Sequence, residues 1–190
     1  GAADEDALNI APARASRLRM PDFAGENKPL GGTEKGIATH LVLQYIDFSK
    51  TGSMEEIQGE IARLEAAHFI SSRQAKAVDA AAVFKLFASP LGQKLRGRGK
   101  LHREFKFSLL WNAEEIFSQG QGEEVLLQGV VDCCIEDEEG LCIVDYKTDN
   151  VRSDEEIAQR AALYSSQLAA YAAALERIFQ KPVRECALYF

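Results

Sequence analysis

The chain has 190 residues, of which 46% are hydrophobic, and a formal net charge of −7 at neutral pH. This length allows one sizeable hydrophobic core, so we expect a single folded domain. Its apolar runs are all shorter than the roughly 20 residues that cross a bilayer, and acidic residues near the N-terminus do not fit a secretory leader. We therefore expect a cytoplasmic protein with no membrane partner.

The chain begins with a segment that shows no sustained periodicity. Residues 1–30 combine prolines with isolated charges, a pattern typical of a linker or an extended arm. The folded domain is predicted to cover residues 31–190.

Three helices are predicted in the first half of the chain. Thr33 can cap a helix over about 34–48, in which His40 lies beside an apolar stripe. Apolar residues at helical spacing predict two further packing helices, near 54–67 and near 73–88.

A basic stretch, residues 94–103, follows these helices. The negative net charge argues against a general attraction to nucleic acid, because phosphate contacts dominate such binding. Any DNA must therefore meet a local patch, and Arg96, Arg98 and Lys100 are its candidate contacts. A solvated basic loop without a binding role is the open alternative.

The second half of the chain alternates between strand-like and helical periods. A strand is predicted at 102–110, two more on either side of an acidic turn, then a long helix and a last strand. This order predicts an α/β fold, more exactly α+β with a mixed sheet, flanked by helices. The last four elements span 125–135, 141–147, 154–179 and Val183–Phe190.

The cysteines form no CxxC pair, so their pattern fits neither a zinc ribbon nor a redox site. We expect all four to be reduced and mostly buried. Cys133 and Cys134 are adjacent on a predicted strand and should point to opposite faces, so they could not hold one metal together.

The densest chemical signal is the run Asp145-Tyr146-Lys147 at the end of an apolar strand. Strand alternation puts Asp145 and Lys147 on one face, where charged groups require an explanation. A structural ion pair is one explanation. The other is a reactive site, in which the ammonium group orients a water or offsets charge that develops on a phosphate.

Asp132 lies on the preceding strand, almost as far from the centre of the turn as Asp145. In a hairpin the two acids should pair approximately across the strands. Two carboxylates held close together repel each other, and a divalent cation relieves the repulsion, so the pair predicts a Mg²⁺ or Mn²⁺ site. Gly129 would leave room for a close approach of backbone or substrate, or would mark a bulge; both interpretations stay open.

Four motifs occur in a fixed order along the chain, and together they resemble the RecB-type nucleases of the PD-(D/E)XK superfamily. The resemblance is closest to the C-terminal nuclease domains of AddA subunits from bacterial AddAB helicase-nucleases. It implies a restriction-endonuclease-like core of order αβββαβ with extra N-terminal helices. The motifs are Gly36-xxx-His40, Gln128-Gly129-Val130-Val131-Asp132, Asp145-Tyr146-Lys147-Thr148-Asp149 and Gln167-xxx-Tyr171.

The resemblance implies a metal-binding and catalytic set. The metal ligands would be His40, Asp132, Asp145 and the backbone carbonyl of Tyr146. Lys147 would be the catalytic lysine and would act together with Asp132 and Asp145.

The resemblance also implies supporting residues. Gln167 and Tyr171, one helical turn apart, would order the site or the DNA strand. Glu104 resembles the family's acid on the first core strand and is ranked as a supporting or secondary metal residue. His68 and His102 have no such companions, and we expect both on the surface.

The implied function is that of a Mg²⁺-dependent exonuclease domain, with Mn²⁺ as a possible substitute, which cleaves single-stranded DNA during double-strand break processing. Its partners would be single-stranded DNA, a helicase portion of the same polypeptide and a second protein of the AddB type. An iron-sulfur cluster is not expected, because no cysteine precedes His40 and only Cys186 lies late in the chain. The alternatives are a stand-alone single-strand exonuclease and a catalytically inactive nuclease fold that binds DNA.

Overall fold

The computed structural model describes residues 31–97, 99–112, 124–147 and 153–189. The predicted α/β class and the order αβββαβ with extra N-terminal helices are confirmed. In chain order the elements are α1 (Gly32–Tyr45), a 3-10 turn η1 (Phe48–Lys50), α2 (Met54–Ala66), α3 (Ser72–Ala77), α4 (Ala80–Ala88), α5 (Pro90–Leu95), β1 (Lys100–Asn112), β2 (Glu124–Glu136), β3 (Leu141–Tyr146), α7 (Asp154–Phe179) and β4 (Val183–Tyr189).

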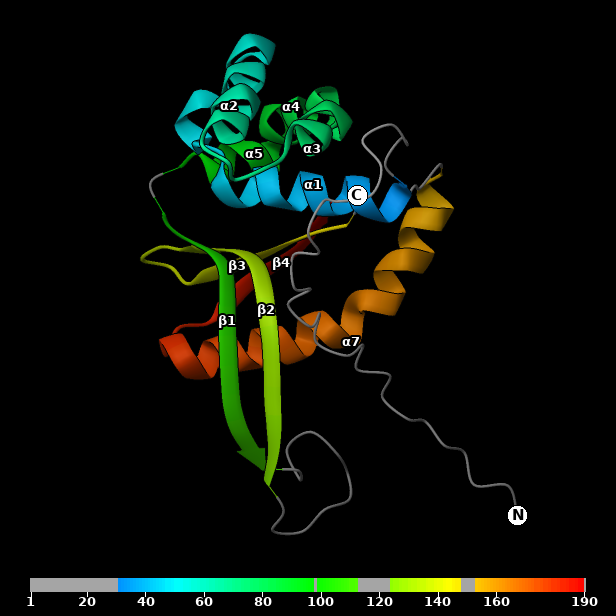
Figure 1. The fold of residues 1–190 in the computed structure, drawn as a ribbon. Coiled ribbons are helices and arrows are strands. Elements are labelled where there is room, and N and C mark those ends of the chain that lie inside the picture. Colours follow the sequence, from blue (N-terminus) through cyan, green and yellow to red (C-terminus); the bar gives the residue numbers. More distant parts are fainter. Residues whose placement is uncertain (1–30, 98, 113–123, 148–152, 190) are drawn as a thin grey trace, which may run out of the picture.

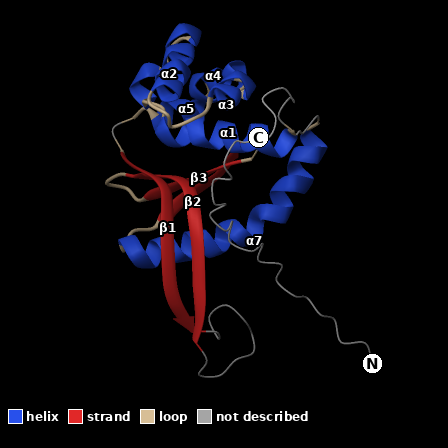
Figure 2. Ribbon diagram, viewed as in Figure 1, coloured by secondary structure: helices blue, strands red, loops and turns tan. Residues whose placement is uncertain are grey.

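The strands form a mixed four-stranded sheet in the order β1-β2-β3-β4. β2 runs antiparallel to both of its neighbours, as hairpins require, whereas β4 runs parallel to β3 because α7 carries the chain back before β4 begins. Helices cover both faces: α1 with the short helices α2–α5 lies on one side, and α7 lies on the other (Figures 1 and 2).

Each face of the sheet has its own apolar cluster, and burial of each large aliphatic side chain contributes about 1.5–3 kcal/mol. Cys133 belongs to the cluster under α1, and Cys134 belongs to the cluster under α7, so the prediction that they face opposite sides is confirmed. The α1 cluster includes Val42, Ile46, Phe87 and Val144, and the α7 cluster includes Val131, Ile143, Leu168 and Leu175.

The helical region differs in detail from the prediction. The helix expected over 73–88 is two helices, because the Asp79 side chain accepts a hydrogen bond from the Ala82 N–H and starts a new helix there. α1 starts at Gly32, before the expected Thr33 cap, and the chain turns extended at Ile46. No described helix has the combination of length and low polarity that a bilayer span requires.

The basic stretch, residues 94–103, does not form a continuous loop. Its first part is the helix α5, which Ser89 caps and Pro90 opens. Lys94 Nζ lies 2.5 Å from Glu185 Oε2, and Arg96 Nη2 donates to the Phe87 carbonyl at 2.9 Å. These two cations therefore have partners within the fold. Arg98 lies outside the described residues, and the exposed Lys100 begins β1.

Two expectations about burial need correction. All four cysteines are free, but only Cys133 and Cys134 are buried; Cys142 is half-buried and Cys186 is exposed. The side chain of His102 is 15% exposed, because Nε2 hydrogen-bonds Glu136 at 2.8 Å. The prediction of a surface position was wrong for this histidine.

β1 and β2 continue together far beyond the rest of the sheet. β2 pairs with β3 only from Cys133 to Glu136, whereas the pairing of β1 with β2 runs from Lys100↔Glu136 to Asn112↔Glu124. The sheet therefore forks at Asp132, and a two-stranded ribbon bends away from β3 (Figure 1).

The side-chain alternation of this ribbon shifts at the fork. In β2, Val131 packs in the α7 cluster and Cys133 in the α1 cluster, although residues two apart share a face in a regular strand. In β1, Phe105 packs in the α7 cluster, while the Arg103 guanidinium stacks 3.8 Å from the ring centroid of Phe48 in the α1 cluster. The shifts fall at Asp132 and Glu104.

Gly129 marks a place where rings occupy the space of a side chain. A Cβ atom there would lie 2.6 Å from the Phe107 ring and 2.7 Å from the Tyr171 ring. Its role is thus to let β1 and α7 close over β2, and neither a bulge nor a substrate approach is required to explain it.

We expect Gly129→Ala to lower the free energy of unfolding by about 1–3 kcal/mol, because the rings must shift out of a packed position. Urea denaturation followed by circular dichroism measures this. The matched control is Gly59→Ala on α2, where an added Cβ meets nothing within 4 Å in the described part of the chain. That change should stabilise the helix by about 0.5–1 kcal/mol. Equal stability of Gly129→Ala and wild type would refute the packing role.

Candidate active site

The candidate site lies at the fork, where β2 stops pairing with β3. Continuing the register Cys133↔Val144 by one residue sets Asp132 opposite Asp145. Beyond the last backbone pair, the Tyr146 N–H donates to Asp132 Oδ2 at 2.8 Å, so a carboxylate replaces the carbonyl that a continuing strand would supply. The expected pairing of the two acids across the hairpin is therefore the arrangement observed.

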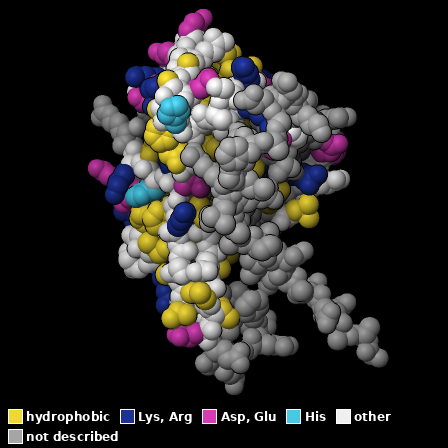
Figure 3. Space-filling view, viewed as in Figure 1, with side chains coloured by type: hydrophobic (Ala, Val, Ile, Leu, Met, Phe, Trp, Pro, Cys, Tyr) yellow, Lys and Arg dark blue, Asp and Glu magenta, His cyan; other side chains and the backbone are white. Residues whose placement is uncertain are grey.

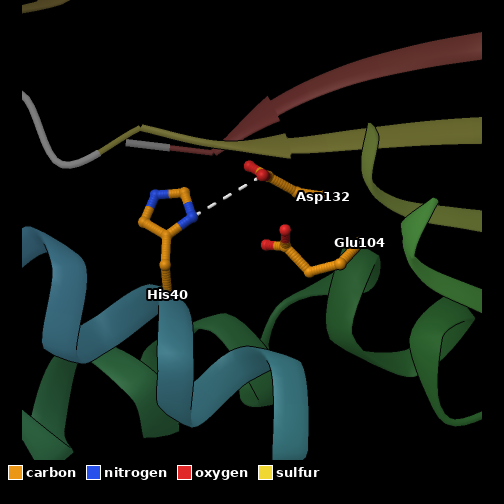
Figure 4. A group of neighbouring side chains, drawn as sticks. All are labelled: His40, Glu104 and Asp132. Carbon is orange, nitrogen blue, oxygen red and sulfur yellow. Dashed lines mark ion pairs between the residues drawn. The ribbon is translucent and has the colours of Figure 1, made fainter. Parts of the chain in front are cut away.

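Three side chains from three separate elements converge here. One ligand-type atom from each of His40 on α1, Glu104 on β1 and Asp132 on β2 lies within 4.8 Å of the others. His40 Nδ1 and Asp132 Oδ1 are 3.6 Å apart, and their side chains are 10% and 13% exposed. Figure 4 shows the three side chains pointing toward one another. The group is enclosed but open to a small ion.

Glu104 has an unusual backbone. Its φ is 48°, in the left-handed region that a non-glycine residue rarely adopts. The pairs Arg103↔Cys133 and Phe105↔Val131 set it opposite Asp132. Such strain costs roughly 1–2 kcal/mol per residue and gathers at functional sites. The structure thus places a ligand-type atom of Glu104 beside those of His40 and Asp132, and its role as a supporting or secondary metal residue stays a prediction.

Arg103 fixes the helix that carries His40. Its Nη1 donates to the Gln44 carbonyl at 3.1 Å and to the Ile46 carbonyl at 2.6 Å. The last carbonyls of a helix have no partners within it, and the last turn of α1 contains no basic residue of its own. A strand residue next to Glu104 therefore ties α1 to β1.

Asp145 and Lys147 form the second part of the site. Asp145 is 6% exposed, and its Oδ2 lies 2.5 Å from Lys147 Nζ. Burial raises the pKa of the Asp145 carboxyl and the Asp132 carboxylate raises it further, while Lys147 and His40 act in the opposite direction. The ionised form of Asp145 is therefore disfavoured in the fold, and a bound cation would favour it.

α7 contributes the third part. Gln167 Nε2 donates to the Tyr171 hydroxyl at 2.9 Å. Burial raises the pKa of Tyr171, and the carboxylates of Asp145 and Asp132 add to that effect, so its phenol lies within electrostatic reach of both acids. The Gln167–Tyr171 hydrogen bond fits the predicted pairing of these residues, and their role at this site stays a prediction.

Tyr164 was not among the residues that the sequence analysis assigned to the site. The Tyr164 ring centroid lies 3.9 Å from Lys147 Nζ. The available signal was its spacing, since Tyr164 is three residues before Gln167 and seven before Tyr171 and therefore shares their helix face.

Some predicted residues are placed less directly. Tyr146 adjoins the site through its N–H and through its ring, whose centroid is 6.2 Å from that of His40. Its backbone carbonyl as a metal ligand stays a prediction. Arg96 and Lys100 are not in the ligand group, and their role in DNA binding also stays a prediction.

The donor set suits a divalent cation. Carboxylate oxygens are the preferred ligands of Mg²⁺, and imidazole is tolerated by transition ions such as Mn²⁺. Two ligands at about 2.1 Å from one ion lie roughly 3–4 Å apart, which agrees with the 3.6 Å between His40 and Asp132. The disfavoured charge of Asp145 next to Asp132 is a second feature that a cation would relieve.

Comparison with known proteins agrees with the motif-based resemblance. The sequence matches the PD-(D/E)XK nuclease superfamily over residues 13–190. It is similar to proteins named as subunits of an ATP-dependent helicase/nuclease: 37% identical over 177 residues to that of Clostridium botulinum (strain 657 / Type Ba4), covering 90% of this chain and 14% of the relative. The identity is 34% for Moorella thermoacetica, covering 98% and 13%, and 39% for Geobacillus thermodenitrificans, covering 92% and 15%. The chain thus spans 13–15% of the length of these relatives.

Because Glu104 has a left-handed backbone, we expect glycine to be more stabilising than alanine at this position, which is the reverse of their usual order in a strand. Glu104→Gly and Glu104→Ala both remove the carboxylate, but only glycine adopts this φ without strain. We expect the glycine variant to unfold with a free energy about 1 kcal/mol higher than the alanine variant. Ser108 on the same strand is the control. There the free energy of unfolding of the alanine variant should be about 0.5–1 kcal/mol higher than that of the glycine variant. Urea titrations with a chelator present measure both pairs, and the same order at both positions would contradict the strain.

The raised pKa of Asp145 predicts a pH dependence of stability in the absence of divalent ions. A carboxyl with a higher pKa in the folded state binds more protons there than in the unfolded state, so stability falls as pH rises through its titration. Asp145→Asn removes this contribution. In chelator, we expect the free energy of unfolding of the variant to rise relative to that of wild type as the pH increases over the range above about pH 4, the ordinary pKa of an aspartate. A constant difference across this range in urea titrations would speak against the raised pKa.

Proposed function

Because this chain belongs to the PD-(D/E)XK nuclease superfamily, we propose that it is a Mg²⁺-dependent exonuclease domain that cleaves single-stranded DNA, with Mn²⁺ able to replace Mg²⁺. One observation carries the proposal. Donor atoms of His40, Glu104 and Asp132 converge within 4.8 Å at the fork of the sheet, beside the buried ion pair of Asp145 and Lys147.

The cation would be held by side chains that arrive from both sides of the fork. His40 and Asp132 are the first candidates, and Asp145, Glu104 and the Tyr146 carbonyl complete the proposed set. When bound, the ion would polarise the scissile phosphate and neutralise charge that develops on its oxygens. The arrangement supports this role because the acids otherwise raise one another's energy.

Lys147 would act directly on the phosphate or on the attacking water. Its side chain is 14% exposed, so the ammonium is largely removed from solvent yet reaches the site. An ammonium group in a partly dehydrated site stabilises developing negative charge better than it would in water. Gln167 and Tyr171 would order the carboxylates or the DNA strand from the α7 side.

The net negative charge of the chain opposes the binding of DNA. On the face shown in Figure 3, the basic side chains of the described residues are scattered among acidic and apolar ones. Arg96, Arg98 and Lys100 remain the proposed contacts; of these, Arg96 also donates to the Phe87 carbonyl. We expect weak binding with a strong dependence on salt.

The names of the relatives suggest the wider context. They are helicase/nuclease subunits of which this chain spans 13–15%, so we propose as its associates a helicase portion in the same polypeptide and a second protein of the AddB type. The proposed role is cytoplasmic: trimming single strands during double-strand break processing and recombinational repair.

Lys147→Ala should lower kcat by about 10²–10³-fold, because it removes the cation that stabilises the transition state. The assay incubates end-labelled single-stranded and double-stranded DNA with the protein, in Mg²⁺ or in chelator. Wild type should cut the single strand in Mg²⁺ and cut neither substrate in chelator.

The matched control is Lys85→Ala, which removes an exposed lysine from α4 and should leave cleavage unchanged. Full activity of Lys147→Ala would remove the catalytic assignment of that lysine. If wild type cuts no DNA and calorimetry detects no Mg²⁺ or Mn²⁺ binding, the alternative of an inactive DNA-binding module replaces the proposal.

A further inference from the structure

Among the described residues, the Lys147 ammonium contacts one charged side chain and one uncharged ring. Nζ lies 2.5 Å from Asp145 Oδ2 on one side and 3.9 Å from the ring centroid of Tyr164 on the other. A cation within about 6 Å of an aromatic centroid is attracted by the negative face of the ring. We propose that Tyr164 is a positioning residue that holds the Lys147 ammonium in the active site. This inference rests on the proposed nuclease function.

Lys147 needs such support because its backbone is anchored but its side chain is long. The Lys147 N–H donates to the Tyr189 carbonyl at 2.7 Å, which fixes the end of β3 against β4. The four-carbon stem beyond it has many rotamers, and fixing them costs up to about 2 kcal/mol. A cation–π contact of about 0.5–2 kcal/mol offsets much of that cost.

The ring itself is held by a well-packed helix. Leu168 and Leu175 of α7 are buried against the sheet, and Tyr171 packs edge-on against Phe107 with centroids 5.4 Å apart. Tyr164 lies about one turn before Leu168 and about two turns before Tyr171 on the same helix face. The contact of α7 with the sheet therefore helps to fix the position of Tyr164.

An uncharged partner for Lys147 reduces competition between the ammonium and the metal ion for the carboxylate oxygens of the site. In the proposed site the Asp145 carboxylate would be a ligand of the metal ion, and it also forms an ion pair with the Lys147 ammonium. If the carboxylate were the only partner, the ammonium would follow it and compete with the ion for the same oxygens. The ring attracts the ammonium without offering the metal ion a ligand, so both cations can occupy the site together.

Two substitutions at Tyr164 separate the ring from its surroundings. Tyr164→Phe keeps the aromatic face, and Tyr164→Leu removes it while retaining an apolar side chain. Leu163→Ala is the matched control, because Leu163 is the preceding residue of α7 and is 69% exposed. If the leucine variant fails to fold, Tyr164→Met tests the same contact.

Cleavage kinetics on single-stranded DNA give the first readout. We expect Tyr164→Leu to lower kcat by about tenfold with little change in KM, which is the size of one cation–π contact. Tyr164→Phe and the control should stay near the wild-type kcat. Equal loss in the phenylalanine and leucine variants would overturn the role of the ring, and so would a loss confined to KM.

Chemical modification of lysine gives a readout that does not require nuclease activity. The rate at which an amine-selective reagent labels Lys147, measured by peptide mass spectrometry relative to Lys85, should rise several-fold in Tyr164→Leu and not in Tyr164→Phe. If wild type does not cleave DNA, the proposed function fails while this experiment still tests the contact. If wild type cleaves and both Tyr164 variants are labelled at the wild-type rate, the positioning role alone is refuted.

Discussion

Two carboxylates at the fork of the sheet repel each other, and the rest of the site is arranged around that repulsion. Burial raises the pKa of Asp145, and the Asp132 carboxylate, which lies opposite when the strand register is continued, raises it further. Glu60 is a useful contrast, because it is also buried yet has its pKa lowered by hydrogen bonds from Arg63. The Glu60–Arg63 pair stabilises the fold, whereas the site tolerates an unfavourable charge. Unfavourable buried charge of this kind is typical of sites that bind or react.

The separation of β2 from β3 provides space and a hydrogen-bond donor for these carboxylates. Where β2 leaves β3, a backbone N–H of β3 is free to bind the Asp132 side chain, and the shift in alternation brings Glu104 and Asp132 to the α1 face together. Helices then approach from both sides of the sheet (Figure 1). α1 brings His40 (Figure 4), and α7 brings Tyr164.

Much of this arrangement could be predicted from the sequence, and the exceptions have physical reasons. Hydrophobic periodicity indicated the order of elements, and equal spacing from the turn indicated the Asp132–Asp145 pairing. The break before Asp79 was missed because a capping side chain ended a period that otherwise continued. Glu104 was named as a supporting or secondary metal residue, but its left-handed φ was not predicted, because the residue pattern of a strand gives no sign of it. His102 was placed on the surface because its partner, Glu136, is contributed by another strand.

The parts of the site are spread along almost the whole described sequence, and this has a consequence for synthesis. His40 comes from the first helix, the acids from strands in the middle, and Tyr164 from the last helix. Ordering ligands across such long loops carries a closure entropy that only the packed domain repays. A nascent chain therefore lacks the complete proposed site until α7 has left the ribosome.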